Sequence, residues 1–120
     1  MQFEWDEDKN IINKAKHKIS FETAALVFND PNYIEMFDFE HGIEEDRFIA
    51  IGKVGEVLFV VFTERKDTIR LISARLATNA ERSLYYDQNI QYWTKPDSNK
   101  RAVKRNWGSN KRADYIWWGL

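Results

Sequence analysis

The sequence contains no cysteine, so it can form no disulfide bond and offers no thiolate for catalysis or metal binding. It also lacks any apolar run approaching the roughly 18 residues that a membrane-spanning helix needs. No signal peptide precedes Trp5, so we expect the chain in the cytoplasm, away from membranes. These absences argue against disulfide-rich secreted proteins and membrane proteins.

Residues that could bind a metal ion are few and badly spaced. The two histidines, His17 and His41, are isolated from each other, and the acidic run at 44–46 lacks the spacing of a calcium loop. A glycine-rich phosphate loop is absent as well, because Gly52 and Gly55 fit a hairpin turn. The sequence therefore predicts neither a metal nor a cofactor.

The chain does contain enough apolar residues for one folded domain, followed by a segment of different character. Hydrophobic residues make up 43% of the 120 residues and aromatic residues 15%, which argues against disorder. Residues 1–87 carry 11 Lys and Arg against 17 Asp and Glu, whereas residues 88–120 carry 7 against 2. We therefore expect an acidic domain at 1–87 and a basic, aromatic C-terminal extension at 88–120. The extension could bind single-stranded RNA, cover the acidic domain or form a homodimer contact, and packing is the favoured interpretation.

Start and stop signals predict three helices. Acidic residues open the first and lysines close it, in the charge order that the helix dipole favours. Ser20 can cap the second helix, which Asp30-Pro31 stops. Thr78 with Glu81 three residues later is a capping-box pattern for the third. The predicted helices span about residues 6–18, 20–29 and 78–85.

Apolar alternation predicts five strands, of which the last two form a hairpin around a tight polar turn. Together with three helices, they are typical of an α+β fold with the helices on one face of an antiparallel sheet. The C-terminal extension has no clear period and is predicted to be helical at most near residues 98–106. The predicted strands are Met1–Trp5, Tyr33–Phe39, Phe48–Ile51, Val57–Thr63 and Ile69–Ala74.

The predicted hairpin and its flanks carry several arginines. Phe62–Arg82 reads FTERKDTIRLISARLATNAER, with Glu64, Arg65, Arg70 and Arg75 in or beside its apolar runs. Arginine fills strands poorly, so several along one hairpin need acidic partners or a polyanionic ligand, for which nucleic acid is the obvious candidate. We expect Arg65 and Arg75, both at strand ends, to reach into a shared cleft.

Three stretches resemble the BrnT family of bacterial toxins: FEWDEDKNIINKAKHKISFETA, DRFIAIGKVGEVLFVVF and the arginine-rich stretch above. The resemblance covers roughly residues 2–86. It implies a RelE/ParE-like fold, with two N-terminal helices packed on one face of an antiparallel sheet and a C-terminal helix. It also implies the toxin of a type II toxin–antitoxin system, an endoribonuclease that cleaves RNA to arrest bacterial growth. The implied partner is a ribbon-helix-helix antitoxin of the BrnA type, through which alone the toxin would reach DNA.

Metal-independent RNA cleavage needs a base for the 2′-hydroxyl, cations around the phosphate and a proton for the leaving oxygen. Arg65 and Arg75 lie in motifs that match the family, and guanidinium groups suit phosphate. His17 also matches the family pattern, and an imidazole can serve as a base or an acid, while Glu64 is a second candidate base. Structural roles stay open: an arginine could pair with Glu64, and His17 could bind the last helix carbonyls.

Four further residues are candidate RNA contacts: Lys16, Arg70, Arg82 and Tyr86. The face that Arg70 occupies depends on the register of the hairpin, and helical spacing turns Leu84 and one of two adjacent tyrosines toward the core. An antitoxin should cover part of the same surface with an acidic segment near the two catalytic arginines. The alternative function is a catalytically inactive toxin fold that only binds an antitoxin.

Overall fold

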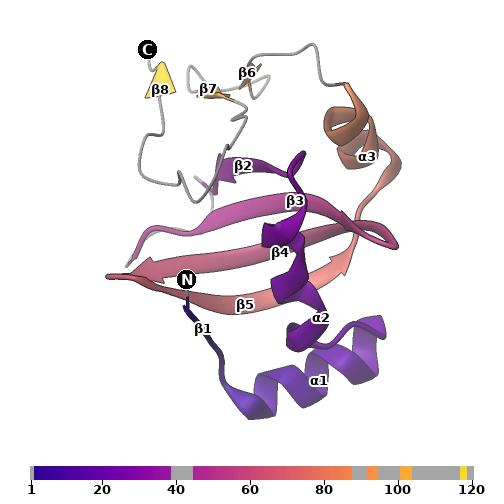
Figure 1. The fold of residues 1–120 in the computed structure, drawn as a ribbon, viewed down its shortest axis with the longest axis vertical. Coiled ribbons are helices and arrows are strands. Elements are labelled where there is room, and N and C mark those ends of the chain that lie inside the picture. The colour runs from indigo at the N-terminus through magenta and orange to yellow at the C-terminus, as the bar shows by residue number, and fades with distance from the viewer. Residues whose placement is uncertain (1, 39–44, 88–91, 95–100, 104–116, 119–120) are drawn as a thin grey trace.

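The computed structural model describes residues 2–38, 45–87, 92–94, 101–103 and 117–118 of the chain. The main-sheet strands are β1 (Gln2–Glu4), β2 (Ile34–Phe37), β3 (Phe48–Val54), β4 (Glu56–Arg65) and β5 (Thr68–Leu76). The helices are α1 (Glu7–His17), α2 (Phe21–Ala25), the short 3-10 helix η1 (Leu26–Asn29) and α3 (Asn79–Tyr86). The sheet has the order β1-β5-β4-β3-β2 and lies between α1 and α3 (Figure 1). This is the α+β architecture that the sequence predicts.

Side chains cap the three α-helices, and the caps of α2 and α3 are the ones that the sequence predicts. Asp6 accepts hydrogen bonds from two backbone N–H groups in the first turn of α1, at 2.9 and 3.3 Å. Ser20 accepts from the N–H of Thr23 at 3.1 Å at the start of α2. Thr78 and Glu81 form the expected capping box at the start of α3, with bonds of 3.2 and 2.8 Å. Each such cap stabilises its helix by about 1 kcal/mol.

The two faces of the sheet bury separate apolar clusters. One cluster includes Phe21 of α2 and Phe62 of β4, and the other includes Ile51 of β3 and Tyr85 of α3. The expectation that all helices lie on one face is therefore wrong, because α3 covers the face opposite α2. The physical reason is that β3 and β4 direct apolar side chains both ways, and a sheet that is apolar on both faces needs cover on both.

The first strand corrects the expectation of a purely antiparallel sheet. β1 lies parallel to β5, with Phe3 opposite Ile69, so the sheet is mixed. Aromatic packing accompanies this direction: the Trp5 and Phe21 rings meet edge to face at 6.1 Å, and the Phe3 and Phe28 rings lie 5.5 Å apart. These contacts hold β1 and the residue after it against the N-terminal helices. Apolar alternation predicts a strand but does not encode whether it runs parallel or antiparallel to its neighbour.

The hairpin between β3 and β4 turns later than predicted. β3 continues through Gly52 to Val54, and the turn lies at Gly55, whose φ is 73°. A Cβ on Gly52 would lie 2.7 Å from the side chain of Val27 and 2.9 Å from that of Tyr33. Gly52 is therefore a close-packing residue inside a strand, and only Gly55 serves the turn.

The predicted hairpin of β4 and β5 is confirmed, and both strands are longer than expected. Val61 is paired with Ser73, whereas the next residue of β4, Phe62, is paired with Leu71. Ile72 is thus an extra residue on β5. This β-bulge changes which side chains of β5 share a face of the sheet.

A second, small sheet lies in the C-terminal extension. Its strands are β6 (Tyr92–Thr94), β7 (Arg101–Val103) and β8 (Trp117–Trp118), in the order β6-β7-β8. The expectation of helix near 98–106 is wrong for residues 101–103, which form a strand, and the remainder of that segment lies outside the described residues. The basic and aromatic side chains of the extension also lie outside the description.

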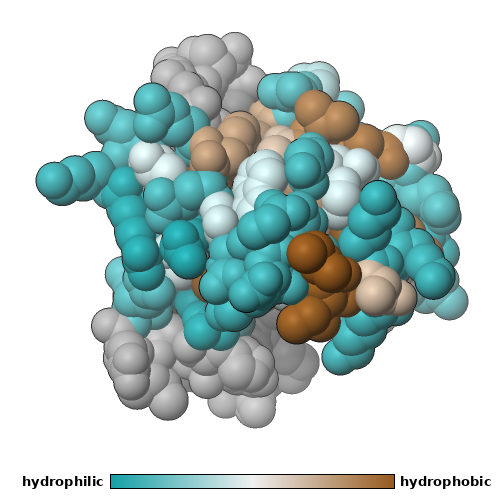
Figure 2. Space-filling model, turned by 90° about the horizontal axis from the view of Figure 1, so that it is seen from below, coloured by the Kyte–Doolittle hydropathy of each residue, from teal (hydrophilic) through white to brown (hydrophobic). Residues whose placement is uncertain are grey.

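The face seen from the α1 side is mainly hydrophilic, with hydrophobic residues gathered only in small, separate patches (Figure 2). α1 itself leaves Ile11 and Ile12 exposed, at 61% and 63%. Two exposed isoleucines do not amount to an interaction surface, because isolated apolar side chains are common on protein surfaces. In the described residues, no helix is both long and apolar enough to cross a membrane.

Candidate functional site

The β-bulge places three arginines of the hairpin on one face of the sheet. Arg70 and Arg75 are five residues apart, an odd spacing that would direct them to opposite faces of a regular strand. The extra residue Ile72 restores a common face, and the register places Arg65 on it as well. Phe59, directly opposite Arg75, packs in the cluster beneath α3, so this arginine face is the one that α2 does not cover.

Each arginine of this face is paired with a carboxylate, at 3.4, 3.1 and 2.8 Å for Arg65–Glu45, Arg70–Glu4 and Arg75–Glu81. The guanidinium-bearing side chains remain 52%, 31% and 36% exposed, respectively, so a polyanion could reach all three. Half-exposed ion pairs contribute only about 0–1 kcal/mol each. A phosphate could therefore replace a carboxylate partner at little cost in stability. Glu64 lies on the opposite face from Arg65, since it is paired with the buried Ile69.

Arg75 is the most firmly held of the three. Its guanidinium donates to both carboxylate oxygens of Glu81, at 2.8 and 3.0 Å, and lies 3.9 Å from the ring centroid of Phe59. Burial by itself would raise the pKa of Glu81, but hydrogen bonds from Arg75 and from the Thr78 N–H outweigh it, so the pKa is below its usual value. Glu81 thus stays ionised and joins the cap of α3 to the arginine face.

Arg65 and Arg75 do not share a cleft, contrary to the sequence-based expectation. Arg75 faces Phe59, and Arg65 lies six residue steps after Phe59 along the extended strand β4. At about 3.3 Å per residue, the two arginines attach to the sheet roughly 20 Å apart. The arginine face is therefore a row along the hairpin, which suits an extended strand better than a single phosphate.

Asn13 attaches α1 to the edge of β5 beside Arg75. Its side-chain amide donates to the carbonyl of Ala74 at 2.9 Å and accepts from the N–H of Ala74 at 3.2 Å, as a neighbouring strand would. β1 pairs only with residues 68–70, so Asn13 takes over the edge beyond it. His17 lies one helical turn after Asn13, at the end of α1 on the side where β5 also ends (Figure 1). His17 and Arg75 thus flank the same end of the β5 edge.

The remaining predicted RNA contacts lie on α1 and α3, the two helices that adjoin the Arg75 end of the row. Lys16 is exposed beside His17, and Arg82 of α3 donates to the side chain of Asn79 at 3.1 Å. Tyr86 is 56% exposed, whereas Tyr85 is buried, as helical spacing predicts. Among the described residues, no hydrogen bond or ion pair joins His17 to an arginine.

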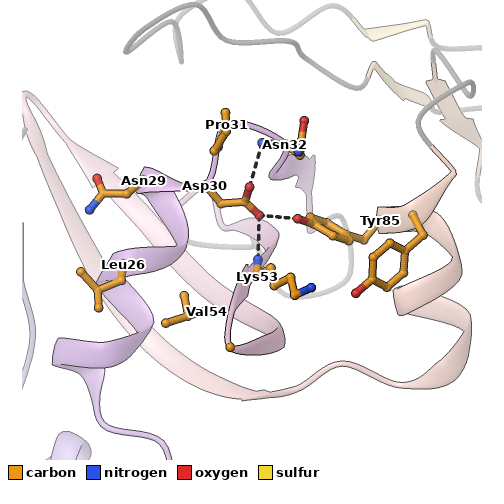
Figure 3. A pocket seen from close by; sticks show the side chains of 10 residues that line it. Leu26, Asn29, Asp30, Pro31, Asn32, Lys53, Val54 and Tyr85 are labelled. Atoms are coloured by element: carbon orange, nitrogen blue, oxygen red, sulfur yellow. Dashed lines mark hydrogen bonds between the residues drawn. The ribbon is translucent and has the colours of Figure 1, made fainter.

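A cleft of about 620 Å³ opens between η1 with the turn that follows it, the β3–β4 hairpin and the end of α3 (Figure 3). Asp30 supports it by accepting three hydrogen bonds: from the Tyr85 hydroxyl at 2.6 Å, from the Lys53 N–H at 2.8 Å and from the Asn32 N–H at 2.9 Å. Burial, followed by the hydrogen bond to Asp30, raises the pKa of Tyr85 well above its usual value. Tyr86 forms part of the cleft wall.

Sequence reasoning missed the residues that position the site. Asp30 was expected only to stop a helix, and Glu81 only to cap one, so their second partners were not predicted. Asn13 and Phe59 carry no motif at all, because their roles depend on contacts with residues far away in the sequence. In the described part of the chain, no group of three His, Asp or Glu side chains could hold a metal ion.

A family model described as the ribonuclease toxin BrnT of type II toxin–antitoxin systems matches residues 5–81. This confirms the resemblance stated from the sequence, and the match contains α1, the hairpin of β4 and β5, and the start of α3. No curated protein matches the chain.

Proposed function

We propose how this chain, which belongs to the BrnT family of ribonuclease toxins from type II toxin–antitoxin systems, cleaves RNA. The cut is endonucleolytic and needs no metal, because the nucleophile is the 2′-hydroxyl of the substrate itself. As that oxygen attacks the adjacent phosphorus, the 2′-proton passes to a base and the bond to the 5′-oxygen breaks. The leaving oxygen takes a proton, and negative charge on the phosphate oxygens peaks in between.

The observation that carries this proposal is the pair of hydrogen bonds between Asn13 and Ala74. They bring the end of α1 to the edge of β5 next to Arg75. In this arrangement Arg75, held by Glu81, stabilises the charge on the phosphate, and His17 is positioned to move the proton. Glu64 remains the second candidate base, but it lies on the opposite face of the sheet from Arg65. We therefore favour His17.

The other cations bind the RNA strand on either side of the cut. Arg70 and Arg65 continue the row from Arg75 toward the hairpin turn, and Arg65, although assigned to catalysis from its motif, lies about 20 Å from Arg75. Its support for the reaction would therefore come through strand binding. Lys16 and Arg82 add positive charge at the Arg75 end of the row, away from the hairpin turn. Cations spaced along a groove are a common way of following a phosphate backbone.

Membership in this family implies that the chain has an antitoxin as its partner. We propose a ribbon-helix-helix antitoxin, with the toxin folded in the RelE/ParE manner at residues 1–87 and extended by residues 88–120, acting in the bacterial cytoplasm. Neutralisation would follow if an acidic segment of the antitoxin replaced Glu45 and Glu81 as partners of Arg65 and Arg75, because the row would then be closed to RNA. A homodimer through the extension is compatible with this arrangement.

Cleavage of a long single-stranded RNA in EDTA tests the proposed function. The parent chain should cut, Arg75→Ala should lose about 10²–10³ in rate, and Arg75→Lys should recover only part of it, since an ammonium cannot form the bidentate contact. Lys9→Ala, on the exposed first turn of α1, is the matched control and should cut like the parent. Absence of cutting by a folded parent would favour the inactive, antitoxin-binding alternative, and full activity of a folded Arg75→Ala would remove Arg75 from the site.

A further inference from the structure

The cleft at the end of α3 combines the groups that hold a nucleobase. Tyr86 offers a largely exposed ring in its wall, and Leu26 and Val54 supply apolar surface opposite. The Lys53 ammonium lies 5.9 Å from the centroid of the Tyr86 ring, near the outer limit of a cation–π contact. Figure 3 shows Lys53 between Tyr85 of α3 and the helix that carries Leu26. Asn29 adds an exposed side-chain amide on that helix.

The cleft is held in shape before any ligand binds. Asp30 receives hydrogen bonds from α3 through Tyr85 and from β3 through the Lys53 N–H, so both walls are fastened to one carboxylate. The same bonds occupy both oxygens of Asp30, at 2.6 to 2.9 Å, and the carboxylate therefore acts as a support for the walls. A pre-formed aromatic wall loses little conformational freedom when a flat ring stacks on it.

We propose that this cleft binds one unstacked base of a single-stranded RNA, with the base on the ring of Tyr86 and the neighbouring phosphate on Lys53. Lys53 has an exposed, flexible side chain, so its ammonium can leave the ring face for a phosphate when the base takes its place. Base–aromatic stacking tolerates all four bases, and any preference would come from the Asn29 amide at the rim.

The position of the cleft relative to Arg75 fits this role. Tyr86 lies five residues after Glu81 on α3, which is about 7.5 Å along the helix axis. Glu81 binds Arg75 directly, so the end of α3 that carries Tyr86 and the arginine face are connected through one short helix. The inference rests on the proposed function for the identity of the ligand, and it adds a binding position that the row of arginines does not include.

Binding of a 2′-O-methyl RNA of about eight nucleotides tests the cleft separately from catalysis, because a capped 2′-oxygen cannot attack phosphorus. Fluorescence anisotropy should show that Tyr86→Ala weakens binding roughly 5- to 140-fold, the value expected for one stacked base. Tyr86→Phe keeps the ring and should stay within about twofold of the parent. Lys53→Ala should lower the slope of log K against log salt by about 0.7. Ile12→Ala, an exposed residue on α1, is the matched control.

The outcomes separate this inference from the proposed function when cleavage of unmodified RNA is measured alongside. A folded Tyr86→Ala variant that binds the oligonucleotide as tightly as the parent overturns the proposal that the cleft binds a base, even if the parent cuts RNA. A parent that binds the oligonucleotide through Tyr86 but does not cut unmodified RNA supports base binding in the cleft and contradicts the proposed catalysis. A parent that neither binds nor cuts contradicts both.

Discussion

The ion pair between Arg75 and Glu81 gives the sharpest quantitative prediction. Glu81 makes two bonds to Arg75 and one to the Thr78 N–H, so Glu81→Ala removes an ion pair and half of a capping box. The ion pair is partly exposed, with side chains 36% and 18% accessible, and is worth about 1 kcal/mol, and the cap contributes about another 1 kcal/mol. Glu81→Ala should therefore lower the free energy of unfolding by about 2 kcal/mol. Thr78→Ala, which affects only the cap, should lose about half as much.

A double-mutant cycle isolates the ion pair. Arg75→Ala, Glu81→Ala and the double variant should show a coupling energy of about 1 kcal/mol in urea unfolding followed by tryptophan fluorescence. The single variant Arg75→Ala should also lose its contact with Phe59, about 0.5–1 kcal/mol more. A coupling energy indistinguishable from zero would mean that Glu81 does not hold Arg75 in solution, and the positioning argument would fail.

The same pair predicts a dependence on pH. The pKa of Glu81 in the folded protein is below its usual value, so its stabilising contribution is complete above about pH 4.3 and is lost as the pH falls through the folded-state value. The difference in unfolding free energy between the parent and Glu81→Gln should therefore be full at pH 7 and shrink below about pH 4. A difference that stays constant down to pH 3 would contradict the ionised pair.

Three further substitutions test the packing that supports the site. Tyr85→Phe removes a 2.6 Å hydrogen bond to Asp30 and should cost about 1.5–3 kcal/mol, which an unchanged urea midpoint would refute. Gly52→Ala forces a Cβ within 2.7 Å of the side chain of Val27 and should cost about 1–3 kcal/mol; a thermal midpoint at or above that of the parent would contradict the close packing. Thr63→Val should stabilise the protein by about 1 kcal/mol, because the buried hydroxyl has no hydrogen-bond partner among the described residues, and a loss of stability would reveal one.

The sequence predicted the elements with strong local signals. Ser20 and the capping box of α3 were recognisable because a cap is formed by residues within four positions of each other. The hairpin of β4 and β5 was recognisable because alternation and a polar turn are also local. By contrast, the direction of β1 depends on Trp5 meeting Phe21, a contact between elements that no local pattern describes.

The site was predictable as a set of residue types, but its geometry was not. Arg65 and Arg75 were found through their motifs, yet a shared cleft was expected where the structure has a row. Ile72 accounts for part of the difference, since a single inserted residue in β5 decides which side chains share a face. The Asn13 contact with Ala74, which brings α1 to the β5 edge, joins residues 61 positions apart and leaves no signal in either segment.

Cleavage through the 2′-hydroxyl at a site organised by Arg75 is the central claim, and one substrate pair tests it most directly. An RNA oligonucleotide with a mapped cut is compared in EDTA with the same oligonucleotide carrying a single 2′-deoxy substitution at the nucleotide 5′ to the cut. The account predicts that the RNA gives a product with a 2′,3′-cyclic phosphate and that the deoxy position is not cut. It also predicts that Arg75→Ala lowers the rate of RNA cleavage by about 10²–10³-fold. Cutting of the deoxy substrate at the rate of the RNA would contradict it.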